Sequence, residues 1–433
     1  MPSWISDLTQ AERRTMIGCF GGWTLDALDV QVYSFALPTI LTLWNITRGQ
    51  AGFLGTSVLL LSAFGGWIAG ALCDRYGRVR VLQATIICYA IFTFLSGFAQ
   101  NFEQLFLFRG LQGLGFGGEW AAGAVLMGEV IRDKYRGRAG GVVQSGWAIG
   151  WGAAAVLYII IFALLPDAVA WRSLFWIGII PAVLVLWLRR HVKEPAVFVA
   201  NRQASGGVFK QLFSMLQPAY LSRTLKLVLL VTGAQGGSFG LSVWLPTYLK
   251  TVRGLSVANT GEFLLVHIFG AFCGFICSAY VTDWFGRKPA IAVSVVGAAA
   301  LMPIYLLLPL GPTALMLLGA PLGFFIYFNF TALGPYMTEL FPTSVRATAQ
   351  GFCYNAGRAI GAFFPLLVGV LSETMPLAQA LVLFCVIAWA LMGIALLMLP
   401  ETRGVSLSAL DAETPDSPTT APAAEPLTGH IHG

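Results

Sequence analysis

Long apolar stretches separated by short polar segments dominate the pattern of this chain. A bilayer core about 30 Å thick needs a helix of about 20 mostly apolar residues to cross it. Twelve such stretches occur, at about 16–40, 51–73, 80–98, 103–128, 139–164, 171–188, 225–249, 260–281, 289–309, 313–337, 348–371 and 376–399. The pattern predicts an all-α integral membrane protein with twelve transmembrane helices in two pseudo-symmetric six-helix bundles, at 1–188 and 225–399.

Two polar segments punctuate this pattern. The first, 189–224, separates the bundles and contains a short amphipathic stretch at 208–216, which we expect to lie along the cytoplasmic membrane surface. The second, 400–433, is rich in Ala, Pro and Thr, and we expect a disordered cytoplasmic tail.

Composition agrees with a membrane protein, because 57% of residues are hydrophobic and only 11% charged. Of the 26 Lys and Arg, 20 fall at helix ends and loops on the side where an even number of spans places both termini. The net charge of +6 therefore follows the positive-inside rule and does not indicate nucleic acid. We expect a multi-pass protein of the cell inner (plasma) membrane with both termini cytoplasmic. The oligomeric state expected is a monomer.

A charged motif occurs twice along the chain. The segment 70–80 returns in weaker form at 279–288, displaced by 209 positions, and a Glu followed seven residues later by Arg returns at an offset of 210. The repeated positions are Asp74, Glu129 and Arg136 in the first half and Asp283, Glu339 and Arg346 in the second. Two similar halves made of apolar helix are typical of a transporter with its substrate site between the halves.

The chain resembles the major facilitator superfamily over residues 10–405. Segments that carry the resemblance are 70–80, 109–113 and 400–404, the last being Pro-Glu-Thr-Arg-Gly, an ending shared by sugar and metabolite porters. The resemblance implies the twelve-helix fold of that superfamily and transport by alternating access.

Three further segments are similar to the proton-coupled organic-anion branch of the superfamily, which includes sialate, lactate and aromatic-acid symporters. They are Asp26–Asp29, Gly117–Trp120 and Tyr354–Arg358. The central Gly-Pro typical of proton-driven antiporters is absent from 146–152. This difference favours symport or uniport.

Five ionisable residues stand inside predicted spans, where each costs several kcal/mol and is a functional candidate: Asp26, Asp29, Arg109, Glu119 and Arg358. At about 1.5 Å per residue, Asp29 matches Arg109 in depth and Asp26 matches Glu119. We expect an Asp29–Arg109 pair, which arriving substrate would release, and an Asp26–Glu119 pair that shares a proton. All three acids are thus candidates for proton coupling. The alternatives are that Asp29–Arg109 is a fixed strut and that Glu119 satisfies backbone groups.

The second half carries neutral residues where the first carries acids, since Asp26 corresponds to Gln235 and Glu119 to Asn329. We therefore expect proton chemistry in the first half and substrate contacts in the second. Arg358, near mid-membrane, is the predicted anchor for a carboxylate; the alternative is an internal salt bridge. Further candidate contacts are Arg109, Gln235, Asn329, Tyr327, Asn355, Trp147 and Trp151, although such aromatics often only pack.

The repeated loop motifs suggest gating. We expect Asp74 to pair with Arg136 or Arg138 and Arg78 to reach Glu129, which would latch the halves until inward opening breaks the contacts. The gating candidates are Asp74, Arg75, Arg78, Glu129, Arg136, Arg138, Asp283, Arg287, Glu339 and Arg346. The alternative is that the arginines serve only membrane topology.

The sequence offers no activated nucleophile, no His/Cys metal cluster and no nucleotide loop, so we expect neither an enzyme nor a cofactor or metal. A proton gradient would then be the energy source. The leading hypothesis is proton-coupled symport of a small organic anion of the monocarboxylate, aromatic-acid or sialate class. A carrier of an organic cation or neutral metabolite is the alternative, and a non-transporting membrane sensor is a more remote one. The partners expected are the anion, a proton and the lipid bilayer.

Overall fold

The computed structural model describes residues 3–192, 215–342 and 345–403, and every regular element within them is a helix. In the first half these are α1 (Ser3–Ser6), α2 (Gln10–Trp44), α3 (Arg48–Tyr76), α4 (Arg78–Ser96), α5 (Phe102–Val130), α6 (Asp133–Leu164), α7 (Asp167–Trp176), η1 (Ile177–Ile179) and α8 (Pro181–His191). In the second they are α11 (Pro218–Thr247), η2 (Tyr248–Val252), α12 (Val257–Phe285), α13 (Arg287–Leu307), α14 (Pro312–Thr338), α15 (Arg346–Gly361), α16 (Phe363–Leu371) and α17 (Leu377–Met398).

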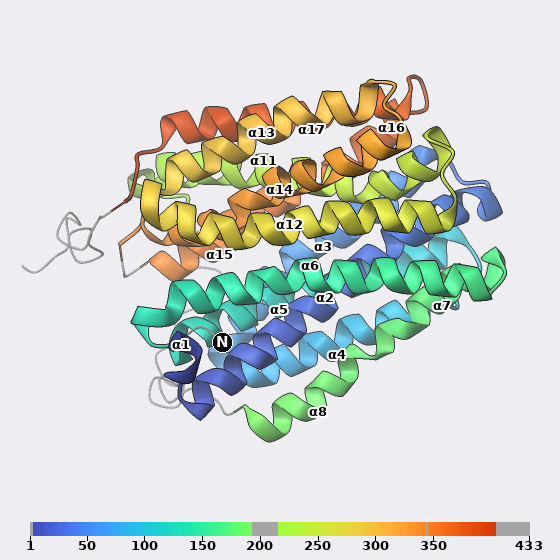
Figure 1. The fold of residues 1–433 in the computed structure, drawn as a ribbon. Coiled ribbons are helices and arrows are strands. Elements are labelled where there is room, and N and C mark those ends of the chain that lie inside the picture. The colour runs from blue at the N-terminus through green and yellow to red at the C-terminus, as the bar shows by residue number, and fades with distance from the viewer. Residues whose placement is uncertain (1–2, 193–214, 343–344, 404–433) are drawn as a thin grey trace, which may run out of the picture.

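The helices form two bundles that lie side by side (Figure 1). Elements α2–α8 make one bundle and α11–α17 the other, and the halves meet where α6 packs on α12 and α3 on α15 and α16. The start of the chain at α1 and the end of α17 lie at the same end of the molecule, which we call the terminal end. The predicted segments 193–214 and 404–433 lie outside the described residues.

Ten helical segments among the described residues are long and apolar enough to cross a membrane. Three of them combine shorter elements: α7, η1 and α8 form one span, α11 and η2 another, and α15 and α16 a third. The remaining long helices, α2 of 35 residues and α5 of 29, contain four of the five ionisable residues singled out from the sequence, and Arg358 lies in α15. Together these elements give the predicted twelve-helix, two-bundle fold.

The break between α15 and α16 places Arg358 in the last turn of α15. The helix ends at Gly361, and the Ala362 N–H donates to the Arg358 carbonyl at 2.8 Å. A cation near a helix C-terminus is stabilised by the partial negative charge of the last carbonyl groups. Helix geometry thus favours a buried arginine at this point.

A seam between α3 and α16 closes the end of the molecule opposite the terminal end (Figure 1). Arg48 Nη1 donates to the Ser372 carbonyl at 2.9 Å, and the Gly49 N–H donates to Glu373 Oε1 at 2.8 Å. The Gly49 N–H, together with the Thr47 hydroxyl, lowers the pKa of Glu373. An ionised Glu373 therefore ties the two halves together here at neutral pH.

Close backbone contact continues this seam toward the middle of the protein. Thr56 Oγ1 donates to the Ala362 carbonyl at 2.6 Å. A Cβ atom at Gly52 would stand 2.5 Å from the Pro365 carbonyl oxygen, closer than real Cβ atoms approach anything. The halves reach this separation only because residue 52 has no side chain.

Candidate functional site

A cavity lies between the two bundles and takes its wall from seven helices. It encloses about 400 Å³ of space not filled by atoms, counting space open to solvent. Its lining residues are Trp23, Phe116, Gln144, Trp147, Gln235, Ser238, Phe239, Phe275, Tyr327, Phe330, Tyr354 and Arg358. An apolar, aromatic wall with a few polar groups is usual for a small-molecule site. We call this the central cavity.

Arg358 supplies the charge of the central cavity. Its side chain is 1% exposed, and its guanidinium carbon lies 4.8 Å from the ring centre of Tyr354 and 5.0 Å from that of Phe116. One ring belongs to each half, so the cation is held between the bundles by cation–π contacts. Gln235 adds a buried amide whose Nε2 has no hydrogen-bond partner among the described residues.

Besides Arg358, the structure brings three of the predicted substrate contacts to the wall of the central cavity, namely Gln235, Tyr327 and Trp147. Asn355 is not among the lining residues, although its neighbour Tyr354 is. The Asn355 side chain itself points elsewhere, since Nδ2 donates to the Gly351 carbonyl at 3.0 Å and the amide lies beside Gly66 of α3.

Two other predicted contacts also lie off the cavity wall. Asn329 Nδ2 donates to Ser294 Oγ at 2.9 Å and so points toward α13. Trp151 packs behind the wall, 5.5 Å from both the His267 and Tyr327 ring centres. Counting residues along each helix predicted how deep Asn329 and Trp151 lie. It did not predict that their side chains point away from the cavity.

Asp26 and Glu119 face each other from α2 and α5, with the ring of Tyr89 as a third neighbour. The two carboxyl groups are 1% and 2% exposed. A Cβ atom at Gly22 would stand 2.2 Å from Glu119 Oε1, so the missing side chain at 22 makes the room that Glu119 occupies. Two acids in one poorly solvated site cannot both ionise without a large cost. The arrangement can hold a proton.

Asp29 and Arg109 do not form the ion pair expected from their matching depth, although both are in the described part of the chain. Asp29 Oδ2 instead accepts from Thr93 Oγ1 at 3.0 Å. Arg109 Nη1 donates to Gln112 Oε1 at 2.6 Å, and the guanidinium lies over the Tyr33 ring at 4.6 Å. Equal height does not bring two side chains into contact when each finds a partner on another side of its helix.

Arg109 belongs to a second cavity, next to the central one. It encloses about 270 Å³ on the same measure, and its lining residues are Val30, Gln31, Tyr33, Gly55, Val58, Leu59, Arg109, Phe239, Ser242 and Val243. Phe239 lines both cavities. The wall again comes from both halves, namely α2, α3 and α5 on one side and α11 on the other. We call this the Arg109 cavity.

Comparison with known proteins decides the family. The sequence matches the Major Facilitator Superfamily over residues 19–365. This chain belongs to the major facilitator superfamily. Accordingly it is a multi-pass membrane transporter and not an enzyme, as the sequence predicted.

Individual relatives agree with the superfamily assignment. The chain is 44% identical over 427 residues to the "Probable 4-methylmuconolactone transporter" of Cupriavidus pinatubonensis, covering 98% of this chain and 99% of the relative. It is 30% identical to the cis,cis-muconate transport protein of Acinetobacter baylyi, over 81% of this chain and 85% of the relative. The solved proton:xylose symporter bound to 6-bromo-6-deoxy-D-glucose superposes with a TM-score of 0.71 at 18% identity, covering 93% and 98% of the two chains. That structural likeness supports the superfamily fold.

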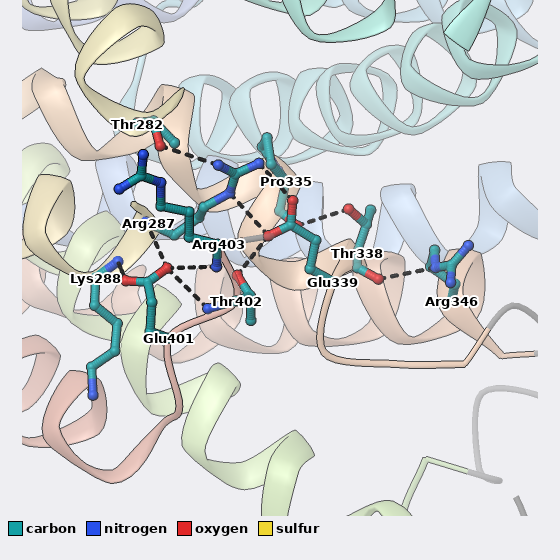
Figure 2. A network of polar contacts seen from close by, with 10 residues as sticks. All are labelled: Thr282, Arg287, Lys288, Pro335, Thr338, Glu339, Arg346, Glu401, Thr402 and Arg403. Carbon is teal, nitrogen blue, oxygen red and sulfur yellow. Dashed lines mark hydrogen bonds and ion pairs between the residues drawn. The ribbon is translucent and has the colours of Figure 1, made fainter. Parts of the chain in front are cut away.

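The repeated charged motif of this superfamily member builds a polar network at the terminal end of the second half (Figure 2). Arg287 forms two hydrogen bonds with Glu339, from Nε to Oε2 at 2.9 Å and from Nη2 to Oε1 at 2.7 Å. Thr402 Oγ1 donates to the same carboxylate at 2.5 Å, and Arg346 Nε donates to the Thr338 carbonyl at 3.0 Å. These contacts join α13, α14, α15 and the segment after α17, all within one half.

Glu401 in the Pro-Glu-Thr-Arg-Gly segment caps α13 (Figure 2). Its carboxylate accepts from the backbone N–H groups of Arg287 and Lys288, both at 2.9 Å. Burial alone would raise the pKa of Glu401, but the N–H groups of Arg287, Lys288, Arg403 and Thr402 outweigh it and lower the pKa. An anion at a helix N-terminus is stabilised by the free N–H groups there.

The first-half motif is described only in part. Arg78 Nη1 donates to the Cys73 carbonyl at 3.1 Å, as its repeat counterpart Arg287 donates to Thr282 at 3.1 Å. Arg75 lies 5.3 Å from the Tyr76 ring centre, and Arg138 is exposed. The predicted gating side chains Asp74, Glu129, Arg136 and Asp283 lie outside the described residues.

A contact that sequence reasoning missed fastens the start of α2 to the α5–α6 connection. Glu12 accepts from Arg132 Nε at 2.8 Å and Nη2 at 3.0 Å and closes a capping box with Thr9. Burial alone would raise the pKa of Glu12, but hydrogen bonds from Arg132 and Thr9 outweigh it and hold the pKa at about 2. No repeat pointed to this pair, because Glu12 lies ahead of the duplicated segments.

Other residues that sequence reasoning missed line the cavities. Gln31 and Gln144 are uncharged polar residues within apolar spans, a signal that was available but weaker than a charge. Trp23, Phe116 and Phe275 carry no signal that separates a cavity wall from ordinary packing. His267 does not line either cavity, and its Nδ1 lies 3.1 Å from the Gly319 carbonyl oxygen.

Proposed function

We propose that this transporter carries out proton-coupled symport of a small organic acid, binding the acid in the central cavity and the proton at Asp26 and Glu119. The observation that carries the proposal is the division of charge between the two places. The central cavity holds a buried arginine, whereas the facing acids lie off its wall.

The anion is bound through Arg358. A guanidinium offers a planar pair of donors that matches a carboxylate, and burial strengthens the attraction. The aromatic wall around it suits a ring or an unsaturated chain. Two relatives are named for 4-methylmuconolactone and cis,cis-muconate transport, which supports an organic acid of that kind.

The proton is bound by Asp26 and Glu119. When both acids and the incoming carboxylate are ionised, the site holds too much negative charge, so substrate binds more tightly once one acid is protonated. That difference in affinity couples the two binding events. Each proton carried in offsets the charge of one substrate carboxylate.

The alternative of an organic-cation carrier has less support. A cation would need an acid on the cavity wall, and the described linings of both cavities contain arginine but no Asp or Glu. A neutral metabolite would not need a buried guanidinium. A non-transporting sensor would not need the acids.

The same proposal includes location and assembly. The protein lies in the inner membrane with its terminal end in the cytoplasm, in keeping with the cluster of basic residues there. We propose a monomer as the working unit.

The test uses purified protein in liposomes loaded with a pH-sensitive dye at zero membrane potential. We expect external muconate or a related acid to acidify the lumen, and Asp26→Asn and Arg358→Gln to abolish that signal. Lys250→Gln, which changes a cation outside both cavities, is the control and should behave as the unmodified protein. Acidification that survives in Arg358→Gln, or uptake of a cation or neutral solute alone, would contradict the proposal.

A further inference from the structure

We infer that the Arg109 cavity is a second anion-binding subsite, so that the transported acid is a dicarboxylate with one carboxylate on Arg358 and the other on Arg109. This inference rests on the proposed function and names its substrate class more closely.

The Arg109 cavity contains buried donors that lack acceptors. Arg109 and Gln31 are each 1% exposed, and Arg109 Nε and Gln31 Nε2 have no hydrogen-bond partner within the described residues. Buried donors left without an acceptor are costly, and native proteins keep few of them. A ligand that brings acceptor oxygens would satisfy both.

The charge of Arg109 calls for an anion in particular. Asp29 is the acid nearest in depth, yet its Oδ2 is bound to Thr93, and the two residues form no ion pair in this described part of the chain. The guanidinium contacts the Gln112 oxygen and the rings of Tyr33 and Phe175, all uncharged groups, and Asp29 acts on it only by electrostatic attraction without an ion-pair contact. A buried cation without a counterion in direct contact is unfavourable. A carboxylate from the ligand supplies that counterion.

The two cavities adjoin along α11. Ser238 lines the central cavity and Ser242 the Arg109 cavity, with Phe239 in the wall of both. Four residues of helix correspond to a rise of about 6 Å. At about 1.5 Å per bond, a diacid with roughly two to four carbons between its carboxyl groups covers that spacing. The central cavity then holds Arg358 with Gln144 and Gln235, and the Arg109 cavity holds Arg109 with Gln31.

The experiment compares adipate with its half-amide, adipamate, by calorimetric titration of the full chain in lipid nanodiscs at pH 7. The two compounds have the same length and differ by one carboxylate, and both carboxyl groups of adipate are ionised at this pH. We expect adipate to bind at least about tenfold more tightly than adipamate, the effect of one charge-assisted contact.

Variants test which arginine causes the preference for adipate over adipamate. Arg109→Gln should bring the two affinities within about twofold of each other by weakening adipate alone, whereas Arg358→Gln should weaken both. Lys250→Gln should keep the tenfold ratio. Should Arg109→Gln fail to fold, Gln31→Leu is the second variant, since it removes the other unpaired donor. It should weaken adipate about threefold or more and adipamate by a smaller factor, because a carboxylate oxygen is a stronger acceptor than an amide oxygen.

Three results would overturn the inference. Equal affinities in the unmodified protein, with binding lost in Arg358→Gln, would leave the proposed function intact and remove the second subsite. A ratio that survives in Arg109→Gln or Gln31→Leu, or an equal loss for both compounds, would make Arg109 a packing residue. Failure of every mono- and dicarboxylate to bind would overturn the proposed function together with the inference.

Discussion

The two halves of this transporter share a scaffold but not a chemistry. In the first half Asp26 and Glu119 face each other in a buried site. At the corresponding positions of the second half Gln235 lines the central cavity and Asn329 binds Ser294. The two bundles are equivalent in fold, but one has acids where the other has amides. This difference separates a site that can hold a proton from a wall that can hold a ligand.

The largest effect should come from removing an acid from the first half. Asp26→Asn should abolish substrate-driven proton uptake, because an amide cannot take up the proton, while exchange of labelled substrate across the membrane continues. Gln235→Asn at the corresponding position should reduce transport by no more than about tenfold, the effect of one neutral hydrogen bond. Dye-loaded liposomes and substrate counterflow measure the two quantities. Equal loss in both variants would remove the distinction between the halves.

A glycine pair offers a finer test of the acid site. Gly22→Ala should displace Glu119, since the new methyl carbon would stand 2.2 Å from Oε1, and overpacking of this kind costs about 1–3 kcal/mol. Gly21→Ala is the matched control, because its methyl carbon would meet Leu184 at an ordinary 3.5 Å. The melting temperature and the rate of proton uptake should both fall in Gly22→Ala, and neither should change in Gly21→Ala. A stable, active Gly22→Ala would show that Glu119 can move without consequence.

The charged motif allows the halves to be compared at the terminal end. Glu339→Gln should lower the free energy of unfolding by about 1–3 kcal/mol, because it weakens a charge-assisted contact with Arg287 whose two side chains are only 15% and 16% exposed. Thermal melts in detergent measure this effect. Arg78→Gln should lower stability by a similar amount if the first half repeats the contact. A neutral Arg78→Gln beside a destabilised Glu339→Gln would limit the network to the second half.

The smallest effect concerns Glu12, the first-half contact without a repeat counterpart. Folding lowers its pKa from 4.5 to about 2, so its stabilising contribution is complete above pH 4.5 and is lost as pH falls through about 2. The difference in melting temperature between the unmodified protein and Glu12→Gln should stay constant from pH 7 to pH 5 and shrink by pH 3.5. A difference that grows on acidification would contradict this assignment. Since Arg132 is half exposed, the difference should be small and weaker in high salt.

The sequence predicted the fold well because span length and apolar content are fixed by the bilayer. The repeated motif predicted contacts that latch the two halves, whereas Arg287 and Glu339 contact each other within the second half. Their gating role stays a prediction. The depth of the site residues in the membrane could be predicted, but the direction in which their side chains point around the helix axis could not. Asp29 and Arg109 stand at similar depth, yet a turn about each helix axis gives them Thr93 and Tyr33 as neighbours.

Cavity walls were harder to predict than charges. An intramembrane arginine such as Arg358 stands out because burial is costly. An amide such as Gln31, or a ring such as Phe116, becomes part of a wall only through the packing of several helices. That packing depends on helix rotation, which the hydrophobic pattern of an almost wholly apolar span does not specify.

The bare backbone at Gly52 has a consequence for the balance between states. A transporter must open toward each side of the membrane in turn, and the fraction of time spent in each state depends on a few kcal/mol. Because residue 52 has no side chain, α3 and α16 meet without hindrance at the Pro365 carbonyl. A methyl group there would clash with that carbonyl and raise the free energy only of the state in which this seam is closed. The size of residue 52 thus helps to determine the relative populations of the two states, although residue 52 lines neither cavity.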